Sequence, residues 1–236
     1  MTHATARNAL VAPALLLVLL ALACGPSKPP VATGPGAAAV AISEATGEAT
    51  RRTEAKSDWA PAAKGDRLTQ SGSVKTGADG SVWLELPGGG VSHLQSNAEL
   101  SVSELVGAES AEAGGSPARL LLELLQGAGL FRWEPSGGEL TIKTPHVQAA
   151  VLGTEFALEV TAEGTTLIVA RGKVRLEKGT REQVVEAGRQ CVAPATGELQ
   201  TPVPAQLIGG TGLAGQLERF VEQGKGLRQR RGIERR

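Results

Sequence analysis

Hydrophobic and polar residues alternate along residues 151–178, VLGTEFALEVTAEGTTLIVARGKVRLEK. Phe156, Leu158 and Val160 are separated by single residues, which is the period of a strand with one buried face. Residues 165–170 are continuously apolar or β-branched, as expected for a strand that is covered on both faces. The pattern therefore predicts three strands joined by two tight turns, and we expect the rest of the chain to pack around them. The turns are predicted at Glu163-Gly164 and at Gly172.

Shorter runs of the same kind extend over residues 40–200 and are separated by turn signals such as Asp79-Gly80. Residues 120–125 are rich in leucine, but the run is short and ends at Gln126-Gly127, which favours a buried strand over a helix. We predict an all-β domain, either an antiparallel meander with a sandwich-like body or a β-solenoid-like body. Further strands are expected near 40–52, 74–76, 82–86, 91–94, 98–105, 120–125, 130–133, 140–144, 147–152, 184–185 and 190–192.

The period changes after Thr201. Leu213, Leu217, Phe220 and Val221 fall on one face of a helix, so we predict a short helix that packs on the β domain. Residues 225–236 are rich in Lys and Arg and could contact anionic lipid or polysaccharide. A frayed, solvated end is the simpler interpretation of this basic segment.

The N-terminal residues 1–23 have the features of a secretory signal peptide, because the apolar run 10–23 is shorter than the roughly 20 residues that span a bilayer. The run ends in Ala21-Leu22-Ala23-Cys24, and small residues before a cysteine resemble the lipobox of bacterial lipoproteins. We predict lipid attachment at Cys24 and export to the outer membrane, facing the periplasm or the surface. Ordinary cleavage beside an incidental cysteine is the alternative. Residues 24–39 are rich in Pro, Gly and Ala and are expected to form a linker.

Composition limits the function classes. The chain has 236 residues with 24 Lys or Arg and 24 Asp or Glu, so its zero formal charge argues against nucleic-acid binding. Two cysteines do not make a disulfide framework. No spacing of His, Cys or carboxylates suits a metal or a catalytic group, since His93 and His146 are far apart and Cys191 stands alone. We therefore predict no enzyme activity, no cofactor and no metal site.

Trp83 is the one candidate for surface binding. It lies on the polar face of its predicted strand, opposite Val82 and Leu84, where an exposed indole could stack on a sugar. A second core layer over that face is the simpler interpretation.

An ordered series of short motifs carries a family resemblance. It includes Lys64-Gly65-Asp66, residues 74–80 (VKTGADG), residues 152–156 (LGTEF) and residues 169–174 (VARGKV). Together with Ile142-Lys143-Thr144-Pro145 and Ala187-Gly188, this series resembles the FecR domain family. The positions matching the family motif, to which we assign structural roles, are Gly65, Asp66, Thr76, Gly77, Asp79, Gly80, Gly153, Thr154, Phe156, Gly172 and Val174.

The resemblance implies an extracytoplasmic all-β domain without catalytic residues. In the namesake regulator such a domain receives a signal from an outer-membrane receptor and controls a sigma factor through a cytoplasmic segment. We find no such segment and no spanning helix here, so we do not expect direct sigma-factor control. The expected function is a membrane-anchored sensor or adaptor that binds another envelope protein. A glycan- or peptidoglycan-binding scaffold is the alternative, motivated by Trp83 and the basic tail.

Overall fold

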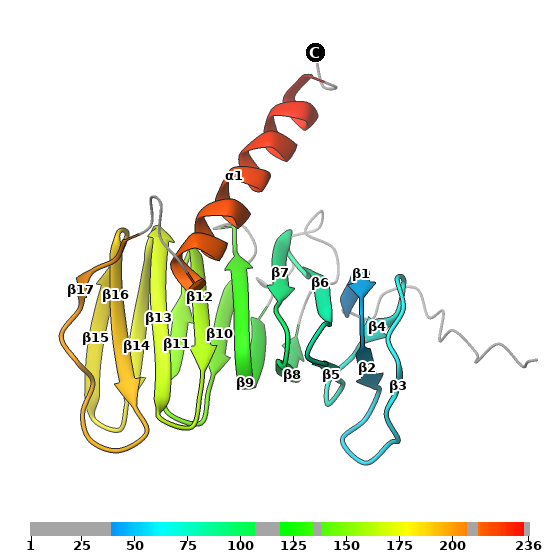
Figure 1. Cartoon of the computed structure of the whole chain (residues 1–236), viewed down its shortest axis with the longest axis horizontal. Helices are drawn as coiled ribbons and strands as arrows, with labels where there is room; N and C mark the ends of the chain where they lie inside the picture. The colour runs from blue at the N-terminus through cyan, green and yellow to red at the C-terminus, as the bar shows by residue number, and fades with distance from the viewer. Residues whose placement is uncertain (1–38, 107–118, 135–137, 207–211, 234–236) are drawn as a thin grey trace, which may run out of the picture. The chain divides into compact units, whose positions relative to one another are not determined.

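The computed structural model describes residues 39–106, 119–134, 138–206 and 212–233, with side chains as far as Gly224. These residues form two β-sheets and one helix (Figure 1), which confirms the predicted all-β fold with a C-terminal helix. The predicted signal peptide, Cys24 and most of the linker lie outside the described residues.

The first sheet, called sheet A, forms the face on which the helix packs. Its strand order is β4-β1-β6-β7-β9-β12-β13-β16-β17. The strands are β1 (Val40–Thr46), β4 (Arg67–Leu68), β6 (Ser81–Leu86), β7 (Gly90–Leu94), β12 (Glu155–Val160), β13 (Gly164–Arg171), β16 (Arg189–Pro194), β17 (Val203–Pro204) and the second half of β9 (Arg119–Arg132).

The second sheet, called sheet B, has the order β3-β2-β5-β8-β9-β10-β11-β14-β15. β9 and β10 run parallel, and the other pairs of described strands are antiparallel. Besides the first half of β9, its strands are β2 (Ala49–Arg52), β3 (Ala60–Pro61), β5 (Ser73–Thr76), β8 (Glu99–Val106), β10 (Glu139–Lys143), β11 (Gln148–Val151), β14 (Lys173–Lys178) and β15 (Arg181–Glu186).

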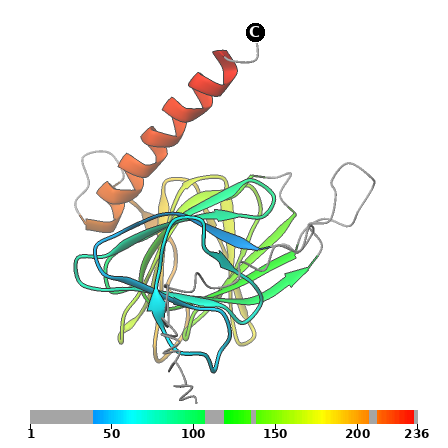
Figure 2. The ribbon, with the colours of Figure 1, turned by 90° about the vertical axis from the view of Figure 1, so that its right-hand side faces the viewer.

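The two sheets enclose one hydrophobic core. Inward-facing residues of sheet A, such as Leu84 and Phe156, belong to the same buried cluster as Leu122 and Leu176 of sheet B. Turned by 90°, the ribbon shows the strands around this interior, with the helix outside (Figure 2). Fully burying one such side chain contributes about 1.5–3 kcal/mol, so the alternation seen in the sequence is what drives the sheets together.

Strand β9 passes from one sheet to the other. The sequence predicts separate strands at 120–125 and 130–133, but the structure has one continuous strand through Gly127. Gly127 has a φ of 76°, and a Cβ there would lie 2.5 Å from the Cα of Ala98. A glycine at this position bends the strand and allows the close approach, which the sequence alone does not distinguish from a turn.

The three predicted strands over residues 155–178 are confirmed as β12, β13 and β14. The turn at Glu163-Gly164 joins neighbouring strands, since β12 pairs with β13. The turn at Gly172 does not, because β13 pairs with β16 whereas β14 pairs with β11 and β15 of the other sheet. The three strands therefore do not form one continuous meander.

The predicted helix is confirmed as α1 (Gly212–Ile233), which extends through much of the basic segment that we expected to fray. It packs on β9, β12 and β13. Leu217 and Phe220 are 0% and 2% exposed, in a second small cluster with Leu130, Ala157 and Ile168 on the outer face of sheet A. The predicted apolar face thus covers the sheet. No helix among the described residues has the length and apolarity that a membrane span requires.

Candidate binding surfaces

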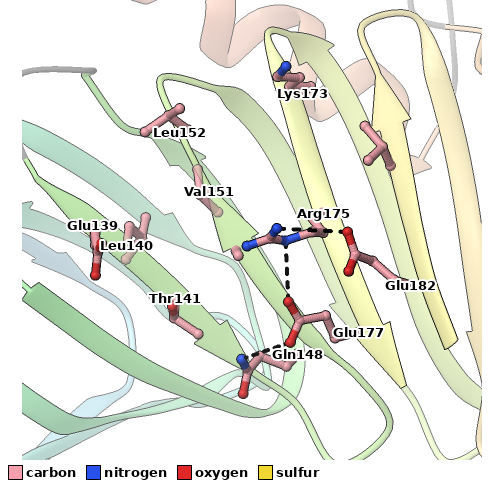
Figure 3. Close-up of a pocket in the computed structure, with 12 residues that line it drawn as sticks. Glu139, Leu140, Thr141, Gln148, Val151, Leu152, Lys173, Arg175, Glu177 and Glu182 are labelled. Atoms are coloured by element: carbon pink, nitrogen blue, oxygen red, sulfur yellow. Dashed lines mark hydrogen bonds and ion pairs between the residues drawn. The ribbon is translucent and has the colours of Figure 1, made fainter. Parts of the chain in front are cut away.

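A trough with a volume of about 480 Å³ lies on the outer face of sheet B (Figure 3). Its floor is low because Thr141 and Ala150, which are cross-strand neighbours, have small side chains. Ala150 in turn lies opposite Arg175 of β14. The lining residues are Glu139, Leu140, Thr141, Gln148, Ala150, Val151, Leu152, Lys173, Arg175, Glu177, Glu182 and Val184. Four adjacent strands thus supply one shallow surface with both apolar and charged groups.

Three of the charged residues in the trough, Arg175, Glu177 and Glu182, form exposed ion pairs. The Arg175 guanidinium lies 3.2 Å from a Glu177 oxygen and 3.7 Å from a Glu182 oxygen. Figure 3 draws both ion pairs as dashed lines. Such exposed pairs contribute about 0–1 kcal/mol each, so a docking partner can replace them at little cost. Leu152 and Val184 beside them are 64% and 43% exposed. Exposed apolar side chains among exchangeable charges favour contact with a protein.

Trp83 of sheet A is half-buried between that sheet and the helix. Its indole ring stacks on the His93 imidazole, with centroids 4.1 Å apart, and on the Phe220 ring at 5.7 Å. These contacts make it part of the second core layer between sheet A and α1. Its remaining surface lines a pocket of about 140 Å³ with Gln95, Gln216, Arg219 and Gln223. The other two tryptophans of the chain lie away from this pocket. Trp133 is buried in the main core, and the Trp59 ring contacts the cationic groups of Arg52 and Lys75.

The partly buried site of His93 disfavours its protonated form. Burial lowers the pKa of His93 from its ordinary value of 6.5, and the charge of Glu44 opposes that shift only in part. One ring nitrogen, Nδ1, lies 3.0 Å from the side-chain amide of Gln95. Because the ring is partly buried beside Trp83, protonation would carry a desolvation cost at this site.

A buried ion pair, which the sequence analysis missed, fixes the helix to sheet A. The Arg132 guanidinium lies 2.9 Å from Glu155 and donates a hydrogen bond to the Phe220 carbonyl at 3.0 Å. A Cβ at Gly224 would lie 1.6 Å from Nη2 of Arg132. No local pattern signals this contact, because the partners come from β9, β12 and α1. Its position between two structural elements indicates a structural role.

Several predicted motif residues meet at one set of stacked turns. Thr76 accepts a hydrogen bond from the Ala98 amide at 2.8 Å and donates one to the Gln95 carbonyl at 2.6 Å. The Gly77 amide donates to the Glu48 carbonyl at 2.7 Å. Asp79 accepts from the Glu48 amide at 3.2 Å. Gly80 lies against the same Glu48 carbonyl, which is where a Cβ would clash. These contacts are internal, so the motif holds turns together.

Gly65 and Asp66 form a separate turn. The Asp66 carboxylate accepts a hydrogen bond from the Ala63 amide at 2.8 Å and pairs with Arg51 at 2.7 Å. Burial alone would raise the pKa of Asp66, but the hydrogen bonds from Arg51 and Ala63, together with the charge of Arg51, lower it from its ordinary value. Gly65 supplies the positive φ of 91° that the turn requires.

The motif residues Gly153, Thr154 and Gly172 lie in the two connections, β11–β12 and β13–β14, where the chain passes between sheets A and B. The Thr154 hydroxyl donates to the Lys173 carbonyl at 2.9 Å and also lies 3.4 Å from the nearby Leu152 carbonyl. Gly172 has a φ of 79° and lies directly on Gly153, whose carbonyl oxygen would be 2.5 Å from an added Cβ. Phe156 and Val174, which follow these turns, are buried in the main core.

Among the described residues, the other candidate groups do not come together in a metal-binding or catalytic cluster. Within the described ranges no cluster of three or more His, Cys, Asp or Glu residues could hold a metal ion. Cys191 is buried, its thiol contacts the Gln200 carbonyl at 3.1 Å, and burial raises its pKa. His146 contacts the Thr165 hydroxyl at 3.0 Å.

Comparison with known proteins finds one matching family model, which covers part of the chain. The sequence model described as FecR protein matches residues 72–175, which run from the residue before β5 into β14. Two crystal structures of a "putative anti-sigma factor" from Parabacteroides distasonis are similar, each with 20% identity and a TM-score of 0.47. The alignment covers 58% of this chain and 62% of each of those chains, which is less than two thirds of their length. None of the curated proteins matches.

Proposed function

We propose that this chain, whose residues 72–175 match the FecR family model, is a non-enzymatic sensor or adaptor that binds another protein of the bacterial envelope. The family is regulatory, and its members act through contacts with other proteins. The observation that carries the proposal for this chain is the trough on sheet B, where exposed Leu152 and Val184 lie among loosely paired charges.

The proposal also places the domain at a membrane. A lipid on Cys24 would tether it through the linker 24–39, and acyl chains contribute about 0.8 kcal/mol per buried methylene. In the producing cell, Cys24→Ser should move the protein from the membrane fraction to the soluble fraction and abolish incorporation of labelled fatty acid. Unchanged acylation and fractionation would show that Cys24 is not the anchor.

The test of adaptor function is covalent capture from the native envelope. Tagged full-length protein is crosslinked in the producing cell, purified under denaturing conditions and analysed by mass spectrometry. We expect a specific receptor, secretion component or membrane regulator to be recovered. Recovery of cell-wall or polysaccharide material alone would contradict the proposal.

A glycan-binding scaffold is the second candidate. The observation that favours it is the pocket beside Trp83, which combines an indole with three glutamine side chains and an arginine. In this case Trp83→Ala combined with deletion of residues 225–236 should reduce co-sedimentation of the protein with purified peptidoglycan. Trp83→Phe is the control, since it keeps an aromatic ring in the helix contact. Equal sedimentation of all variants would remove the reason for this candidate.

A further inference from the structure

The two sheets differ in how their edges are protected. In the described part of the chain, sheet A ends in β4 and β17 and sheet B ends in β3 and β15. Three of these edge strands are only two residues long, and both β3 and β17 contain a proline. Short strands and prolines both hinder pairing with another strand.

Strand β15 lacks these protections. It has six residues, Arg181–Glu186, and no proline. It pairs with β14 on one side, and on the other side none of its backbone groups bonds to the backbone of a described residue. Alternate residues of such a strand direct an N–H and a C=O outward, so the edge can accept a further strand.

The outward-facing side chains of β15 indicate the chemistry of that strand. Glu182, Val184 and Glu186 share the outer face because Val185 between them is buried in the core. Glu182 is only loosely paired, 3.7 Å from Arg175, and Glu186 is exposed with no ion pair to a described residue. At every second residue, the edge strand therefore presents an acidic, then an apolar, then an acidic side chain on its outer face.

This pattern disfavours pairing between two copies of the chain. Antiparallel pairing of two β15 strands centred on Val184 would place Glu182 of one copy opposite Glu186 of the other, and like charges at directly opposed positions are destabilising. A strand with basic residues two positions either side of an apolar residue would instead pair opposite charges at both sites.

We propose that the free edge of β15 is the docking site for an extended strand of a partner protein that carries the pattern basic, any residue, apolar, any residue, basic. The strand adds to sheet B by backbone hydrogen bonds, and its alternate side chains meet Glu182, Val184 and Glu186. The trough adjoins this edge, since Glu182 and Val184 also line it. This inference rests on the proposed adaptor function and gives the partner's chemistry.

Two synthetic peptides test the inference directly on the full-length protein. One is Thr-Lys-Thr-Val-Thr-Lys-Thr with blocked ends, and the other has Glu in place of both Lys residues. We expect the Lys peptide to bind about tenfold more tightly, because two opposite-charge pairs replace two like-charge pairs. It should also slow hydrogen exchange of the amides in residues 181–186.

Charge reversal supplies the decisive control. The double variant Glu182→Lys with Glu186→Lys should reverse the preference, so that the Glu peptide binds more tightly. The matched variant Glu85→Lys with Glu163→Lys changes the net charge equally at exposed positions outside the trough, one on β6, which has neighbours on both sides, and one in the turn between β12 and β13. It should keep the original preference. Equal behaviour of the two variants, or unchanged exchange in residues 181–186, would overturn the inference.

Capture in the cell separates this inference from the proposed function. If the native protein and the Glu182→Lys, Glu186→Lys variant recover the same envelope protein in equal amounts, β15 is not the docking site although the adaptor function stands. If the native protein recovers no envelope protein, the adaptor function fails, and the peptide experiment still decides whether the β15 edge accepts a strand.

Discussion

Individual glycines set the positions at which the chain changes direction, and Gly172 is the clearest case. Its positive φ disfavours a side chain, and its contact with the Gly153 carbonyl leaves no room for one. Gly179 also has a positive φ, of 58°, but no atom lies within 4 Å of where its Cβ would be. The two positions therefore separate the cost of backbone strain from the cost of a steric clash.

We expect Gly172→Ala to lower the free energy of unfolding by about 2–4 kcal/mol, since strain at positive φ is joined by displacement of the Gly153 backbone. Gly179→Ala should cost only about 1 kcal/mol, from strain alone. Urea denaturation followed by tryptophan fluorescence measures both. Equal losses for the two variants would mean that the close contact at Gly172 contributes nothing.

His93 should make stability depend on pH. Because its pKa is lowered in the folded protein, the unfolded chain binds a proton more readily between the folded pKa and 6.5. The stabilisation is complete above pH 6.5 and is lost as the pH falls through this window. Asp66, whose folded pKa is also lowered, acts separately at pH values below 3.8.

Thermal unfolding measured from pH 7.5 to pH 5 should therefore show a falling melting temperature for the native protein. His93→Phe keeps an aromatic ring against Trp83 but cannot be protonated, and its melting temperature should vary less over the same range. The same pH dependence in both proteins would exclude His93 as the cause.

At the scale of elements, the helix and the sheet are joined by apolar packing and by the buried Arg132. The apolar face of the helix follows from the spacing of Leu213, Leu217, Phe220 and Val221, and the structure confirms it. The contact of Arg132 with Glu155 and Phe220 has no sequence signal, because it needs the register between β9 and β12 and the placement of α1. Local periodicity predicts elements, but only long-range pairing places their polar contacts.

We expect Gly224→Ala to loosen the helix even though alanine favours helices over glycine by about 1 kcal/mol. The added methyl group would occupy the position of the Arg132 guanidinium, which is held by Glu155 and the Phe220 carbonyl. Hydrogen exchange of residues 212–224 should become faster. Gln223→Ala, at an exposed neighbouring position, is the control and should leave exchange unchanged or slower. Slower exchange in Gly224→Ala would show that the contact adapts without cost.

At the scale of the whole described domain, alternating strands predicted an all-β fold but not the distribution of the strands between two sheets. The period of two residues puts Phe156 and Val174 on a buried face whether their strands belong to one sheet or to two. The pattern therefore does not distinguish these two arrangements. The same ambiguity hides the trough, since Thr141, Ala150 and Arg175 become neighbours only through pairing of β10, β11 and β14. The family resemblance could be found from the sequence because many of its motif residues lie in turns. The backbone of such turns requires particular residue types, such as glycine at positive φ.

We propose that the outer face of sheet B binds another envelope protein. The most direct test repeats the crosslinked capture with Ala150→Trp, which fills the floor of the trough, and with Ala78→Trp, which adds the same side chain at an exposed turn. We predict that the native protein and Ala78→Trp recover the same partner and that Ala150→Trp recovers at least about tenfold less, as expected for a clash at the centre of an interface. Equal recovery by all three proteins would contradict the claim.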